Sequence, residues 1–232
     1  MSSAVTLTRT RMRTPRSAAV AGIIFSVLLM TIFFLLRMFA PTDPLEPSAW
    51  LVTGSGAVTL ALNLVPFAGI CFLWFIGVLR DRLGQLEDRF FATVFFGSAL
   101  LFLGTLFAAA AVVGAIILVF AAEPDQIMTS TSLRFARALA YSLMNIYAIK
   151  MAGVFMISTS TLAIYTGLAP RWLAILGYVS AAVLLLGSSY ITWGFMVLPL
   201  WVLLLSIHVL VDNFRGSGWR AEAGAAESVS MP

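Results

Sequence analysis

Long apolar stretches, separated by short polar segments, fill this sequence almost from end to end. An α-helix rises about 1.5 Å per residue, so about 20 apolar residues cross the roughly 30 Å hydrocarbon core of a bilayer. Of the 232 residues, 61% are hydrophobic and only 10% are charged, whereas a soluble domain carries roughly 25% charged residues. We therefore predict an all-α, polytopic transmembrane helical bundle with six spans, at residues 17–40, 50–79, 90–121, 134–165, 172–188 and 190–211.

Arginine residues are concentrated in alternate connecting segments. Four precede the first span, three lie between the second and third spans, one precedes the fifth span and two follow the sixth. The intervening segments 41–48 and 122–132 carry acidic residues and no lysine or arginine. Because cytoplasmic loops of membrane proteins are enriched in Lys and Arg, the pattern predicts a multi-pass protein of the plasma membrane with both termini in the cytoplasm (N-in/C-in).

Three regions follow from this topology. Residues 1–16 form a basic cytoplasmic tail, residues 17–212 form the transmembrane domain, and residues 213–232, rich in Gly, Ala and Ser, are predicted to be a disordered cytoplasmic tail. The connecting segments are too short for a separate soluble domain. The net charge of +4 lies at the ends of the spans, which is typical of contact with lipid headgroups rather than with nucleic acid.

Lys150 is the only lysine and lies near the middle of the fourth span. A charge at that depth costs roughly 2.5–3.5 kcal/mol on insertion scales, and no span carries a carboxylate at comparable depth. Asn63 lies at a similar depth in the second span, three residues before Pro66, which removes one helical hydrogen bond. We predict a polar intramembrane site in which neutral oxygens at Asn63 and the Leu62 carbonyl surround the Lys150 amine. The alternative is that Lys150 only snorkels to water.

The fourth span carries polar side chains on two sides. Tyr147 and Thr161 share the side of Lys150, whereas Tyr141 and Asn145 recur at helical spacing on the other side, with Arg134 and Arg137. A helix that is polar on two sides cannot face lipid on both, so we predict that the fourth span is central in the bundle. We include Tyr141 and Asn145 in the candidate polar site.

Small residues form a stripe along the third span. Such stripes permit close approach between helix backbones, so this side is predicted to pack within the subunit, against a second copy, or against another membrane protein. The stripe comprises Gly97, Gly104, Ala108, Ala111 and Ala115.

His208 is the only histidine, and Asp212 follows it by one helical turn in the sixth span. A neighbouring carboxylate stabilises the histidine cation. The pair is therefore a candidate pH-sensitive site, with a plain interfacial ion pair as the more ordinary interpretation.

The residue inventory excludes most cofactor chemistry. One histidine and one cysteine cannot build a structural zinc site, which takes four Cys or His ligands. No Walker A, HExxH or Gly-rich dinucleotide motif occurs. We therefore predict no metal, no cofactor and no enzymatic activity.

In its composition the chain resembles six-span membrane proteins of bacteria, and the excess of Arg over Lys together with the high Ala content is similar to actinobacterial proteins. This resemblance implies no activity. Two functions remain open: a small-solute transporter or channel-like protein with its site around Lys150 and Asn63, or a non-catalytic structural or regulatory membrane subunit that packs through the small-residue stripe. Transport requires that Lys150 face a solvent-accessible cavity.

Overall fold

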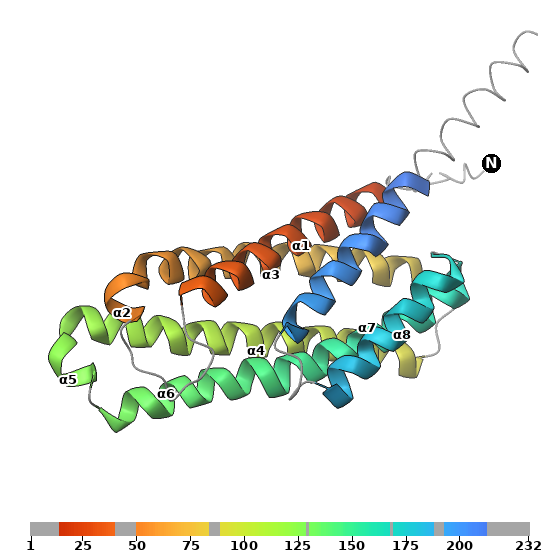
Figure 1. Cartoon of the computed structure of the whole chain (residues 1–232). Helices are drawn as coiled ribbons and strands as arrows, with labels where there is room; N and C mark the ends of the chain where they lie inside the picture. Colours follow the sequence, from red (N-terminus) through yellow and green to blue (C-terminus); the bar gives the residue numbers. More distant parts are fainter. Residues whose placement is uncertain are drawn as a thin grey trace, which may run out of the picture.

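The computed structural model describes residues 14–39, 50–83, 89–128, 130–167, 169–187 and 193–212, and these residues are almost entirely helical (Figure 1). Residues 1–13 and 213–232 of the predicted tails lie outside the described residues, as do residues 40–49, 84–88 and 188–192 between helices. The elements are α1 (Thr14–Phe39), α2 (Trp50–Thr53), α3 (Ser55–Leu83), α4 (Arg89–Ala122), α5 (Pro124–Met128), α6 (Thr131–Ser142), the π-helix η1 (Leu143–Ala148), α7 (Ile149–Thr166), α8 (Arg171–Gly187) and the 3-10 turn η2 (Gly194–Met196), which opens the last helix, 197–212.

The all-helical class is confirmed, and five helices in the described residues are long and apolar enough to cross a membrane. They lie close to the predicted first, second, third, fourth and sixth spans. The predicted fifth span corresponds to α8, an apolar helix of 17 residues. Its length of about 26 Å falls short of the roughly 30 Å core, so the predicted count of six spans is not confirmed.

Local sequence explains several helix boundaries. The turn at Gly54 separates α2 from α3, and a side chain there would meet the Phe39 carbonyl oxygen at 2.8 Å, so this close approach requires glycine. Ser130 caps α6, since its hydroxyl accepts a hydrogen bond from the Leu133 backbone N–H at 3.2 Å. Gly167 ends α7 in the left-handed conformation (φ 63°), which glycine adopts without strain.

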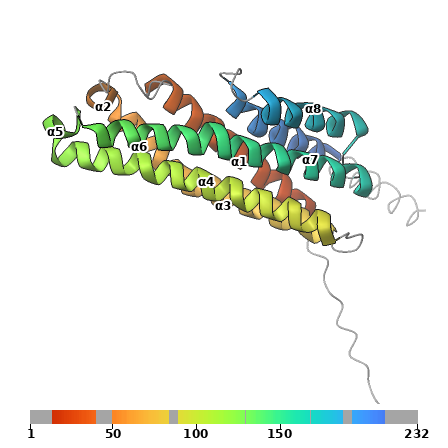
Figure 2. The ribbon, with the colours of Figure 1, turned by 90° about the horizontal axis from the view of Figure 1, so that it is seen from below.

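The helices differ greatly in length, and this gives the bundle two unequal ends. The helix formed by α6, η1 and α7 is about 52 Å long, since its apolar helical segment has 35 residues. α8 packs along α7 and the last helix also contacts α1, whereas α6 extends beyond the hairpin of α8 and the last helix (Figures 1 and 2). We call the end without the hairpin, formed by α2, α5, α6 and the adjoining turns of α3 and α4, the distal lobe.

Each end has its own hydrophobic core. The main core is centred on Phe72 of α3, whose ring contacts rings from three other helices: Phe25 of α1 at 4.6 Å, Phe102 of α4 at 5.5 Å and Phe155 of α7 at 5.3 Å between centroids. All four rings are buried. The distal lobe has a smaller separate cluster, formed by Trp50, Leu51, Val58, Ile116, Ile127 and Leu133.

α4 is longer than a perpendicular span needs, so it either tilts in the membrane or extends beyond the hydrocarbon at the distal lobe. α4 has 34 residues and is about 51 Å long, so it exceeds the roughly 30 Å core by about 20 Å. The side of the bundle that carries the hairpin is much shorter. Leu118 of α4 is 74% exposed and lies 16 residues beyond Phe102, which places it about 24 Å from the ring cluster.

We predict that a cysteine at Leu118 is accessible to water. In a Cys71→Ser background, a membrane-impermeant maleimide is expected to label Leu118→Cys, because thiols ionise and react only where water reaches them. Leu101→Cys, also exposed on α4 but near the ring cluster, is the matched control and should stay unlabelled. Equal protection of both cysteines in intact and in opened vesicles would place the lobe inside the lipid.

Candidate functional site

Lys150 and Asn63, the two residues at the centre of the predicted polar site, both lie on the outside of the bundle. Each is exposed, Lys150 on α7 and Asn63 on α3. Between the two helices lies α4, which contacts both. The described residues place no hydrogen-bond partner next to either side chain. The structure therefore does not bring Lys150 and Asn63 together.

Contacts between α7 and α8 fix the level of Lys150. A side chain at Gly177 would meet the Ser160 hydroxyl, and one at Gly153 would meet Leu185 at 2.9 Å. The two helices are antiparallel. A residue one turn closer to the distal lobe on α7 is therefore level with a residue one turn later in the sequence of α8. Lys150, about one turn beyond Gly153, is thus level with the end of α8 at Gly187.

This position gives Lys150 a different environment from the one expected in mid-bilayer. The carboxyl end of a helix carries the negative pole of its dipole and unsatisfied carbonyl groups, which favour a cation by about 0.3–1 kcal/mol. Lys150 lies halfway along its own long helix, but that helix includes the amphipathic α6 in the distal lobe. The register therefore places Lys150 beside the end of α8, and its depth in the membrane stays a prediction.

We predict that Lys150 tolerates neutral substitution. Lys150→Met should lower the unfolding free energy in detergent by about 1 kcal/mol or less, and Lys150→Glu should cost more, because a carboxylate opposes the α8 dipole. Lys150→Arg is the charge-preserving control. A loss of several kcal/mol in Lys150→Met would show instead a tightly solvated buried amine.

The π-helix η1 separates the residues that were predicted to share one polar side. A π-helix has wider turns than an α-helix, so spacing counted across it no longer predicts a common face. Arg137 is buried, whereas Tyr141 is 44% exposed and Tyr147 is 57% exposed. Asn145 lies inside η1 and donates to the Tyr141 carbonyl oxygen at 3.1 Å, so its amide supports the backbone of this irregular segment.

Thr161 joins α7 to α8. Its hydroxyl oxygen lies 2.7 Å from the hydroxyl of Tyr178, and the Thr161 hydroxyl also donates to the Ile157 carbonyl. The sequence identified Thr161 but not Tyr178, since nothing along the chain indicates which residue of the next helix faces it. The hydrogen bond is a packing contact between helices, which is the usual role of hydroxyls in membrane helices.

We predict that Tyr178→Phe lowers the unfolding free energy by about 0.5–2 kcal/mol, the range for a hydrogen bond between membrane helices. Tyr165→Phe, at a tyrosine that is 75% exposed, is the matched control. A double-mutant cycle with Thr161→Val measures the coupling. Additive losses would mean that the two hydroxyls do not interact.

Buried hydroxyls gather in the half of the bundle opposite the distal lobe. Four of them donate a hydrogen bond to a carbonyl oxygen of their own helix, so each of these hydroxyl groups has a partner. These are Ser26, Ser98, Ser158 and Thr159. The hydroxyls of Ser160 and Ser206 are buried with no hydrogen-bond partner among the described residues, where each packs against a glycine of the neighbouring helix, Gly177 and Gly22.

Arg37 forms a cation–π contact that sequence reasoning missed. Its guanidinium lies 5.5 Å from the centre of the Trp193 ring. Arg37 lies in the last turn of α1, and Trp193 directly precedes η2. Such contacts stabilise by about 0.5–1 kcal/mol at exposed sites. The contact ties the distal end of α1 to the hairpin.

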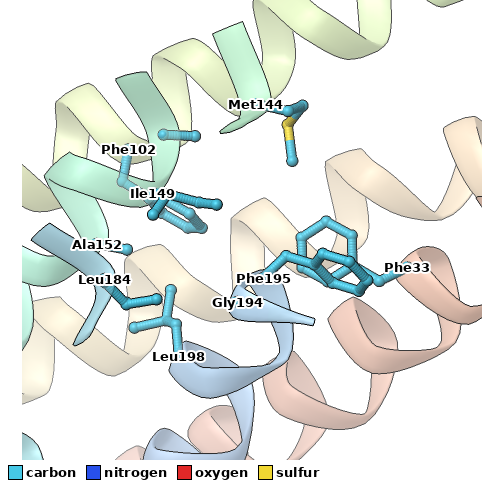
Figure 3. A pocket seen from close by; sticks show the side chains of 10 residues that line it. Phe33, Phe102, Met144, Ile149, Ala152, Leu184, Gly194, Phe195 and Leu198 are labelled. Carbon is cyan, nitrogen blue, oxygen red and sulfur yellow. The ribbon is translucent and has the colours of Figure 1, made fainter. Parts of the chain in front are cut away.

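The space between α1, α7 and the hairpin is a small apolar cavity (Figure 3). Its volume of about 10 Å³ is at the lower limit of the roughly 10–15 Å³ that one water needs. Phe33 and Phe195 close one end, with ring centres 4.9 Å apart, and Ile149 beside Lys150 closes another. A solute does not fit here, and Lys150 is not among the residues that line this space.

The small-residue stripe of α4 faces outward. Gly104, Ala108, Ala111 and Ala115 are exposed, and a side chain built at Gly104 would meet no atom within 4 Å. Only 17% of the most apolar stretch of α4 is buried, against 39% to 56% in the other four spans. The value of 56% belongs to the fourth predicted span, the most buried of the five, and its central position stays a prediction. The stripe does not pack within the subunit.

His208 is half-buried and Asp212 is exposed in the last helix. No hydrogen bond or ion pair joins them in the part of the chain that the structure describes, and the pH-sensitive pair stays a prediction. No three His, Cys, Asp or Glu side chains are grouped as metal ligands within the same residues. Comparison with protein families, with curated proteins and with solved structures found no match to this chain.

Proposed function

We propose that this protein is a non-catalytic subunit of a membrane assembly, and that it binds a transmembrane helix of a partner protein through the small-residue side of α4. The observation that carries this proposal is that this side of α4 permits close helix packing but faces outward and does not pack within the subunit. Gly104 with Ala108 and Ala111 with Ala115 repeat the small-xxx-small spacing that lets helix backbones approach closely. Lipid tails gain little from such a surface, whereas a second helix packs well on it.

The interior of the bundle also favours a packing role. Phenylalanine rings fill the centre where α1, α3, α4 and α7 meet. A carrier needs polar groups around a central cavity, and the polar side chains of this interior are mostly hydroxyls bonded to their own helix. The transporter or channel hypothesis around Lys150 and Asn63 stays a prediction. The outward position of both residues supports transport less well than it supports a packing role.

We further propose that α8 and the last helix both cross the membrane, as the fifth and sixth spans, with both termini in the cytoplasm of a plasma membrane. A 17-residue helix is at the short end of the spanning range. Lys150 and Arg37 would then lie near the outer surface, level with the hairpin turn. The long side chain of Lys150 would reach the headgroups.

Replacement of small residues on α4 tests the proposed function. Ala108→Leu and Ala111→Leu should each weaken the complex by about tenfold or more, which corresponds to about 1.4 kcal/mol, because the added side chain separates the helices. Ala182→Leu, at an exposed alanine of α8, is the control. The complex isolated in mild detergent from the source membranes is measured by native electrophoresis. An unchanged complex in both α4 variants contradicts the proposal.

A further inference from the structure

We draw no further inference here: the strongest candidate, the two buried N–H groups at the distal end of the bundle (Arg37 of α1 and Trp50 of α2) that have no hydrogen-bond partner among the described residues, carries nothing, because no contact between described residues places the two groups in one site and the Arg37 guanidinium already lies over the Trp193 ring.

Discussion

The packing of aromatic rings around Phe72 is the constraint on which the rest of the structure depends. Lipid is as apolar as a leucine side chain, so burial from water cannot drive membrane helices together, and close packing must. Phe72 contacts rings from three other helices at centroid distances of 4.6–5.5 Å, within the favourable range for aromatic pairs. Because this cluster joins four helices, it sets which sides of α3 and α4 turn inward and which remain open to lipid or to a partner.

Helix length is the second organising feature. The helices of one side run about 50 Å, whereas the hairpin of α8 and the last helix reaches only part of the way along them. The distal lobe follows from this difference, with a small core of its own. Lys150 is level with the end of α8, and the Arg37–Trp193 contact joins α1 to the hairpin.

The sequence predicted the helices well and their mutual registers poorly. Hydropathy located the spans because lipid imposes the same length and polarity on every crossing helix. The level of Lys150 beside the end of α8 depends on the register between α7 and α8, which no pattern within one helix reveals. The π-helix rotated the polar residues that follow it, and the pairs Thr161–Tyr178 and Arg37–Trp193 join separate helices. The stripe on α4 was identified from its spacing, but its outward direction followed only from the position of Phe102 in the core.

The central claim is that the cluster of aromatic rings around Phe72 holds the bundle together. The most direct measurement is the unfolding free energy of Phe72→Ala in a lipid bilayer, compared with Phe34→Ala at an exposed ring of α1. The account predicts a loss of about 3–5 kcal/mol for Phe72→Ala, typical of a buried ring, and a much smaller loss for Phe34→Ala. Similar small losses in both variants would contradict it.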